Sequence, residues 1–251
     1  MVLVSLFLFG AIFGSFYNVC IYRLPKDLNL ITKKSFCTSC KYLIPFYLNI
    51  PIFSYIFNVG KCRNCKAKIS VSYLIVELMT GLLFVVAYLR YGLDFKFLFY
   101  ILFYSSLLII FFTDLKEYLI LDKITFSISI LGLLSIFLNI NPFGTTFFSS
   151  IIGGLIGYLI IYVIRYLFLK IRKVEGMGLG DAKLFMLIGV WLGIKSIYIV
   201  LMTSALVGAL VGLFIIYKYK KGRDFQIPYG CFITISAALY PDYGSLIYNL
   251  I

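Results

Sequence analysis

Two aspartates, Asp114 and Asp181, are the strongest candidates for chemistry in this sequence. Asp114 directly follows the apolar run 97–113, and Asp181 directly precedes the apolar run 183–194. A carboxylate at the C-terminal end of a helix opposes the helix dipole, so solvation alone explains Asp114 poorly. An ionisable side chain at the boundary between hydrocarbon and water is a candidate functional residue, and it usually has an interacting partner. We expect Asp114 and Asp181 to be partners.

Paired acids point to one kind of chemistry. Two carboxylates that share a site of low dielectric constant do not both ionise readily, so one keeps its proton. The ionised acid can take a proton from water while the protonated acid polarises an amide carbonyl, which hydrolyses a peptide bond without a covalent intermediate. The sequence contains no histidine, which excludes imidazole bases and His-based triads.

The residues around these acids are candidates for supporting roles. Gly176, Gly178 and Gly180 alternate before Asp181, and this density of glycine favours a loop over a helix interior. Lys183 is either a solvated charge or a group that biases ionisation of the acids. Asp122 begins the next apolar segment, where an acid stabilises a helix N-terminus.

Glu77 lies in the first turns of the predicted helix 73–91. It either extends toward the interface, stabilises a helix N-terminus or has a functional role.

Four cysteines form two C-x₂-C pairs, Cys37/Cys40 and Cys62/Cys65. Paired motifs of this kind predict a tetrahedral zinc site. Four thiolates leave no open coordination position, so the zinc would be structural; a redox site or free thiols are the alternatives. We interpret Cys20 and Cys231, in or beside apolar segments, as packing residues.

The composition predicts an all-α, polytopic membrane protein. Hydrophobic residues make up 62% of the 251-residue chain, against about 45–50% in soluble domains. The net charge of +13 could suit nucleic acid, but the basic residues lie between apolar segments, as the positive-inside rule expects. We therefore expect membrane lipid, and no nucleic acid, as a partner.

The apolar segments predict about eight transmembrane helices, because about 20 residues cross the hydrocarbon core. They cover residues 2–22, 73–91, 97–113, 121–140, 147–169, 183–194, 196–217 and 229–250. We divide the chain into a first transmembrane helix at 1–22, a cytosolic zinc-binding loop at 23–72 and a transmembrane domain at 73–251. With the loop in the cytosol, most of the 23 basic residues face the cytosol.

The helix order bears on whether the two acids can meet. An even number of crossings separates Asp114 from Asp181, so both should lie at the cytosolic membrane edge. Glycines at 153, 154, 157, 189, 193, 208 and 212 predict close helix packing.

In their order along almost the whole chain, these residues resemble the type IV prepilin peptidases, which are GxGD aspartic proteases with N-methyltransferase activity. One departure is Ile120-Leu121 before Asp122, where a proline often stands, which touches loop shape and not the acids. The resemblance rests on the segments Gly14–Pro25, Cys37/Cys40, Asn49–Pro51, Gly60–Lys66, Glu77, Asp114/Asp122 and Gly178–Lys183.

The resemblance implies an activity and a location. Asp114 and Asp181 would be the catalytic pair, cleaving the leader of prepilins or pseudopilins on the cytosolic side of the bacterial inner membrane. Methylation of the new N-terminus by S-adenosylmethionine is implied in the same way, with the 23–72 loop associated with it. The alternatives are an ion-coupled transporter that uses Asp114, Glu77 and Asp181 as a relay, or a non-catalytic zinc-loop scaffold of a pilus or secretion system.

Overall fold

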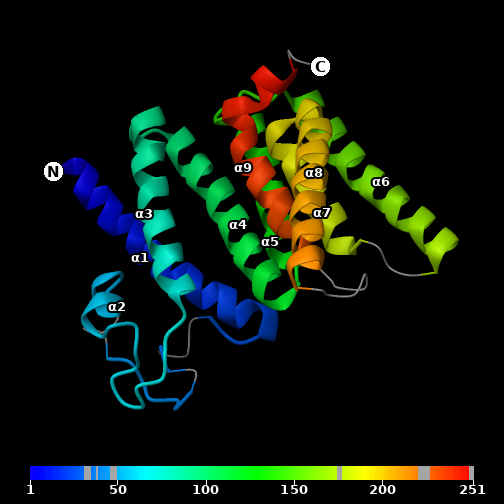
Figure 1. Cartoon of the computed structure of the whole chain (residues 1–251). Coiled ribbons are helices and arrows are strands. Elements are labelled where there is room, and N and C mark those ends of the chain that lie inside the picture. The colour runs from blue at the N-terminus through cyan, green and yellow to red at the C-terminus, as the bar shows by residue number, and fades with distance from the viewer. Residues whose placement is uncertain (31–34, 38, 46–49, 174–176, 220–226, 249–251) are drawn as a thin grey trace. The chain divides into compact units, whose positions relative to one another are not determined.

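The computed structural model describes residues 1–251 except 31–34, 38, 46–49, 174–176, 220–226 and 249–251. Asn49 and Gly176, both named above, lie outside the described residues. The described part of the chain is helical and contains no strand, as the sequence predicts. Its elements are α1 (Val2–Arg23), η1 (Leu24–Lys26), α2 (Phe53–Phe57), α3 (Val71–Tyr91), α4 (Phe95–Glu117), α5 (Asp122–Phe137), α6 (Phe147–Arg172), α7 (Leu179–Leu192), α8 (Ile194–Tyr219) and α9 (Tyr229–Tyr248) (Figure 1).

The chain separates into two compact units, Met1–Phe97 and Leu98–Ile251. The first contains α1, α3 and the cysteine loop, which we define as residues 24–70 between those helices. The second contains α5 to α9 and most of α4. The division of the chain by function at residues 22 and 72 stays a prediction.

In the N-terminal unit, α1 and α3 pack against each other at close range. A Cβ at Gly14 would lie 2.7 Å from the Glu77 Cα, and one at Gly10 would lie 2.8 Å from the Thr80 carbonyl oxygen. Only glycine permits this approach of the two backbones. The close packing fixes the position of Glu77 next to α1.

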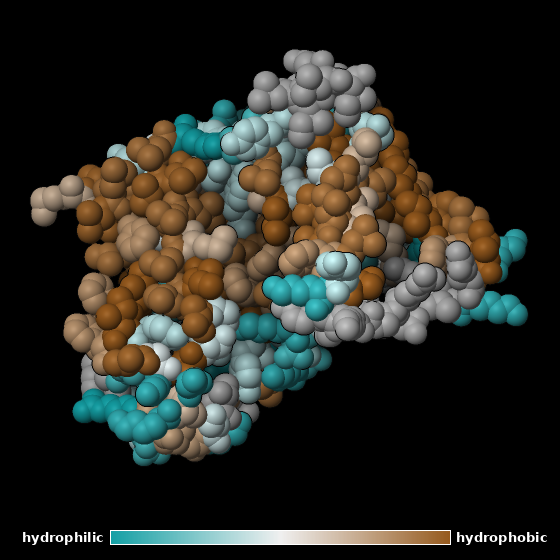
Figure 2. Space-filling model, viewed as in Figure 1, coloured by the Kyte–Doolittle hydropathy of each residue, from teal (hydrophilic) through white to brown (hydrophobic). Residues whose placement is uncertain are grey.

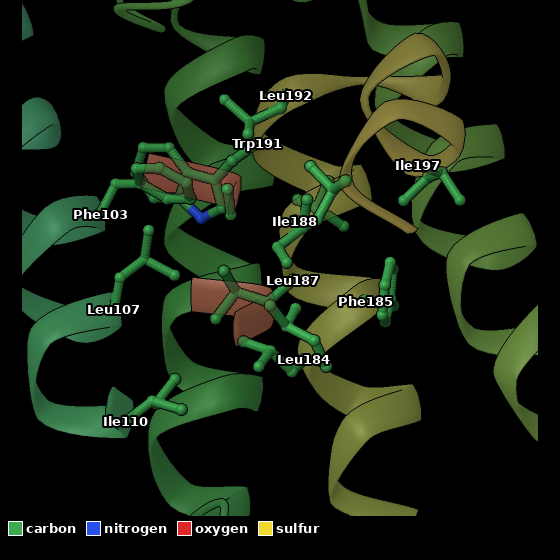
Figure 3. Packing of buried hydrophobic residues seen from close by; sticks show 14 of the residues in the cluster. Phe103, Leu107, Ile110, Leu184, Phe185, Leu187, Ile188, Trp191, Leu192 and Ile197 are labelled. Atoms are coloured by element: carbon green, nitrogen blue, oxygen red, sulfur yellow. The ribbon is translucent and has the colours of Figure 1, made fainter. Parts of the chain in front are cut away.

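The core of the C-terminal unit surrounds α7, which packs against α5, α6, α8 and α9. Trp191, Phe185 and Leu187 of α7 are fully buried, and Figure 3 shows them with Phe103 and Ile197. The Trp191 indole N–H donates to the Ile128 carbonyl at 2.9 Å, so its polar atom is satisfied. A helix that is apolar on every side is stable only when it is enclosed in this way.

The predicted glycine contacts are present in this unit. The backbones of Gly153 in α6 and Gly189 in α7 touch, and a Cβ on either would overlap the other helix. A Cβ at Gly157 would lie 2.6 Å from the Phe185 carbonyl oxygen. These glycines therefore allow α6 and α7 to pack along their length.

Five described helices are long and apolar enough to cross a membrane: α1, α3, α4, α6 and α8. The predicted count of eight spans is not confirmed, although eight helices coincide with the eight apolar segments. The α5 and α7 helices have only 16 and 14 residues, fewer than the about 20 that cross the hydrocarbon core. Figure 2 shows apolar side chains over the helices in view and hydrophilic ones over the cysteine loop. The protein is a membrane protein.

Candidate active site and metal centre

Asp114 lies in the last turn of α4, three residues before the helix ends at Glu117. Its side chain is buried, and its Oδ2 accepts a hydrogen bond of 3.0 Å from the Cys231 backbone N–H. Cys231 is the third residue of α9, so this N–H is one of those left without an intrahelical partner. The carboxylate therefore caps the positive end of α9, which offsets its unfavourable place at the negative end of α4.

Asp181 lies in the first turn of α7 and is also buried. Its Oδ2 accepts a hydrogen bond of 3.1 Å from the Gly178 N–H. Gly178 is the N-cap of α7, so this bond is the half of a capping box that does not need an N-cap side chain. Both predicted acids are thus held by amides at helix N-termini.

The structure places Asp114 and Asp181 at the same end of the C-terminal unit, where the starts of α7 and α9 both contact Ile120. Ile120, in the short connection after α4, lies between the start of α7, which carries Asp181, and the start of α9, which binds Asp114. A Cβ at Gly180 would be 2.9 Å from the Ile120 Cβ, and one at Gly230 would be 3.0 Å from the Ile120 Cδ1. Figure 1 shows the end of α4 and the start of α9 at the same end of this unit.

The prediction that the glycines before Asp181 form a loop is wrong for Gly180. The helix α7 begins at Leu179, so Gly180 is helical and only Gly178 precedes the helix. The reason for glycine at position 180 is space, because a side chain there would collide with Ile120. Close approach to a neighbour, rather than an unusual backbone conformation, explains this glycine.

Lys183 and Asp122 form an ion pair that joins α7 to the start of α5. The Lys183 Nζ lies 2.7 Å from Oδ1 and 2.6 Å from Oδ2 of Asp122. The Asp122 side chain is more than half exposed, so the pair contributes little to stability. Lys183 therefore ties the start of α5, which follows the connection that carries Ile120, to the helix that carries Asp181.

Three residues of the site were not predicted from the sequence: Tyr229, Gly230 and Cys231, at the start of α9. Cys231 was interpreted as a packing residue; its thiol is buried, but its backbone amide holds Asp114. The Tyr229 hydroxyl is within hydrogen-bond distance of Ser204 Oγ at 2.9 Å. The dipeptide Pro228-Tyr229 marks a helix start and is the signal in the sequence that could have located these amides.

The four cysteines of the two pairs gather in the cysteine loop, with their Sγ atoms all within 4.8 Å of one another. Each pair sits in the same kind of turn. The Cys37 N–H donates to the Tyr42 carbonyl, the Cys62 N–H donates to the Ala67 carbonyl, and Lys41 and Lys66 have positive φ of 60° and 59°. The sequence repeat is therefore also a structural repeat, and the four thiols are placed to hold one metal ion.

The geometry fits a tetrahedral thiolate site. Zinc–sulfur bonds of about 2.3 Å in a tetrahedron place sulfurs about 3.8 Å apart, and the Cys37 and Cys65 Sγ atoms are 3.9 Å apart. The backbone N–H of Cys40 lowers the pKa of the Cys37 thiol to about 6. The thiolate is the form that binds metal.

Glu77 lies in the N-terminal unit, buried on the side of α3 that faces α1. Its Oε2 accepts a hydrogen bond of 2.7 Å from the backbone N–H of Ile52, which precedes α2. This bond holds the cysteine loop at the helix pair, a role that none of the three alternatives considered for Glu77 named.

Comparison with known proteins identifies both parts of the chain. Residues 8–91 match the family model described as the bacterial peptidase A24 N-terminal domain, and residues 101–213 match the type IV leader peptidase family. A protein of Aeromonas salmonicida named prepilin leader peptidase/N-methyltransferase is 34% identical over 92% of this chain and 87% of its own length. Proteins of the same name are each 32% identical in Dichelobacter nodosus, over 97% of this chain and 92% of theirs, and in Bacillus subtilis, over 96% and 94%.

No solved structure matches the chain. The family models and the relatives agree over nearly its whole length. The chain belongs to the prepilin leader peptidase/N-methyltransferase family.

Proposed function

We propose that this protein is an aspartic endopeptidase of the bacterial inner membrane that removes the leader from type IV prepilins or pseudopilins and then methylates the new N-terminus. The observation that carries the peptidase is the position of Asp114 and Asp181 at the same end of the C-terminal unit. The relatives' shared name supports both activities. Asp114 and Asp181 are the proposed catalytic residues.

The reaction follows from two carboxyl groups that hold one proton between them. The ionised acid takes a proton from a water molecule while the water oxygen attacks the scissile carbonyl carbon, and the protonated acid gives its proton to the carbonyl oxygen. The tetrahedral intermediate then collapses, the C–N bond breaks and the nitrogen takes up a proton from the pair. The Gly178 amide at the start of α7 donates to Asp181, and the Cys231 amide at the start of α9 donates to Asp114, so a helix N-terminus holds each carboxyl group in place.

The position of the pair suits a substrate that is half in the membrane. Asp114 ends an apolar helix that is long enough to span, so the pair lies at the membrane edge. In a prepilin, a short basic leader precedes an apolar helix, and the bond between them would lie at the same depth. The many basic residues of the connections support a cytosolic position for this edge.

An incubation of the purified protein with a model prepilin and S-adenosylmethionine tests both activities at once. Mass spectrometry of the product should show a mature pilin without its leader, with one added methyl group on its N-terminal nitrogen. An unprocessed prepilin would contradict the peptidase. A cleaved but unmethylated product would leave a peptidase alone.

We further propose that Cys37, Cys40, Cys62 and Cys65 hold one structural zinc ion. Zinc suits a set of four thiolates, and a closed site of this kind crosslinks a loop that has little apolar core of its own. The substitution Cys37→Ser should lower the zinc content from about one ion per chain and make the cysteine loop more sensitive to protease. Atomic absorption of the purified variant measures the first effect and limited proteolysis the second.

The control for this substitution is Cys20→Ala, which removes a buried thiol of α1 that is not part of the cluster. Its zinc content should equal that of the wild type. The assignment is refuted if Cys37→Ser also retains the full zinc content. Leader cleavage by Cys37→Ser should fall less than its zinc content, because the thiols are not proposed to touch the scissile bond.

A further inference from the structure

A cavity of the N-terminal unit has no role in leader cleavage as proposed above. It has a volume of about 340 Å³ and lies between α1, the cysteine loop and α3. This volume is in the range of sites that enclose small ligands. Its walls combine aromatic and apolar side chains with polar and charged ones, and include Asn18, Tyr22, Phe36, Tyr55, Tyr73 and Glu77.

One face of α1 forms a wall of this cavity. Ser15, Asn18, Val19, Tyr22 and Arg23 all line it. Steps of three or four residues, from 15 to 18 to 22 and from 15 to 19 to 23, place these side chains on one helix face. From Ser15 to Arg23 this wall is about 12 Å long, because each residue of a helix advances about 1.5 Å. The cavity therefore suits an elongated ligand.

Asn18 presents a buried polar atom that nothing in the described protein satisfies. The residue is 4% exposed, its Nδ2 donates to the Tyr73 carbonyl at 3.0 Å, and its Oδ1 has no hydrogen-bond partner. The orientation of the amide is fixed, because a carbonyl oxygen accepts only from the nitrogen end. Buried polar atoms are almost always paired, so an unpaired acceptor in the wall of a cavity points to a ligand that donates an N–H or O–H.

The charged side chains that line the cavity are one acid, Glu77, and four bases, Arg23, Lys61, Arg63 and Lys68. The Glu77 carboxylate accepts from the Ile52 amide, and the buried Arg23 guanidinium donates through Nη1 to the Asn29 and Leu30 carbonyls. The rings of Tyr22, Tyr55 and Tyr73 offer flat faces for an aromatic base and for a cationic centre. Together these groups match a ligand that has an aromatic base, N–H and O–H donors, a cation and a carboxylate.

We propose that this cavity binds the adenosyl sulfonium that serves as methyl donor, with Asn18 Oδ1 accepting a hydrogen bond from it. The inference rests on the methyltransferase part of the proposed function. In the reaction the methyl carbon leaves sulfur, whose bonding pair stays behind as a thioether lone pair, and bonds to the neutral nitrogen of the pilin N-terminus, which then releases a proton to solvent. The chain's own part is to bind the donor, orient it through Asn18 and hold it between the aromatic walls.

Binding of S-adenosylmethionine to the full-length protein in detergent, followed by isothermal titration calorimetry, tests the site directly. Asn18→Leu keeps the side-chain size but removes the acceptor, and should raise the Kd about tenfold, the effect of one hydrogen bond. The matched control is Ser105→Ala in α4, which removes another buried oxygen without a partner that does not line the cavity. Ser105→Ala should bind the donor as the wild type does.

A second measurement does not depend on the Leu variant folding. Tritiated S-adenosylmethionine cross-linked to the wild-type protein by ultraviolet light should label peptides from residues 15–23 or 67–77. Label confined to residues 98–251, or an unchanged Kd in a folded Asn18→Leu variant, would overturn the site. So would an Asn18→Leu variant whose methylation is impaired only through the KM for the pilin, because the cavity would then hold the protein substrate.

The outcomes separate this inference from the proposed function. A wild-type protein that cleaves prepilin but neither binds nor uses S-adenosylmethionine removes the methyltransferase and the site with it. A wild-type protein that methylates, but carries the label elsewhere, removes the site alone. In every supporting outcome Asn18→Leu cleaves the leader at the wild-type rate.

Discussion

Replacing either Asp114 or Asp181 with Asn should lower the rate of leader cleavage by about 10³-fold or more, the range that acid–base groups contribute. An amide keeps the shape of the side chain but cannot exchange a proton with water. The Asn oxygen can still accept the hydrogen bond from Cys231 at position 114, or from Gly178 at position 181. The helix caps are therefore retained, and the loss falls on chemistry. Cleavage of a model prepilin, followed by gel shift and mass spectrometry, measures the rates.

Two controls make this result specific. Asp94→Asn changes an exposed acid to its amide at the start of α4, where the carboxylate caps the Phe95 N–H and Asn is an equally good cap. It should cleave at the wild-type rate. Thermal unfolding of Asp114→Asn and Asp181→Asn should begin no lower than that of the wild type, because a neutral amide costs less to bury than a carboxylate. Normal processing by either variant would end the aspartic mechanism.

Eight of the described helices could be predicted from the sequence because each coincides with an apolar run between polar connections. The same reasoning found Asp114 and Asp181, since a carboxylate beside an apolar run is conspicuous. It could not find the hydrogen-bond donor to Asp114, because that donor is the backbone amide of Cys231, 117 residues later in the chain. Every residue except proline carries such an amide, so only the packing of α9 against α4 selects this one.

The glycines show a second limit. In sequence, Gly180 looked like part of a loop, because glycine has the least preference for a helix interior of all residues except proline. Glycine stands at position 180 because Ile120, from another element, lies where a side chain would be.

The number of membrane spans could not be predicted from the apolar segments alone, because α5 and α7 are too short to be counted by length. The burial of α7 by four neighbouring helices, which makes a short helix stable, is a property of the assembled unit.

The cysteine cluster, in contrast, could be predicted in full from the sequence. Its four ligands could be predicted because each C-x₂-C pair folds into its own local turn, with the hydrogen bond that closes it spanning only five residues. Local geometry is encoded locally, so the repeat in sequence became a repeat in structure. The unsatisfied oxygen of Asn18 was not predictable, since it depends on α3 being held against α1 by Gly10 and Gly14.

The substitution Gly230→Ala should slow cleavage about 100-fold without touching either acid. A Cβ at this position would lie 2.8 Å from the Asp114 Oδ2, 3.0 Å from its Cγ and 3.0 Å from the Ile120 Cδ1. The Asp114 side chain must rotate away, which breaks its bond to the Cys231 N–H and moves it relative to Asp181. Displacements of about 1 Å in a catalytic group cost about this much. The effect should fall on kcat, because the carboxylate is displaced and not removed.

Gly208→Ala is the matched control, in α8 of the same unit. A Cβ there would meet its nearest neighbour, the Phe232 ring, at 3.4 Å, an ordinary contact, so cleavage should stay within about twofold of the wild type. Binding of S-adenosylmethionine should be unchanged in both variants, since neither glycine lines the cavity of the N-terminal unit. If Gly230→Ala cleaves at the wild-type rate, the contact between α9 and Asp114 does not position the acid. The amides of α9 would then be a structural cap alone.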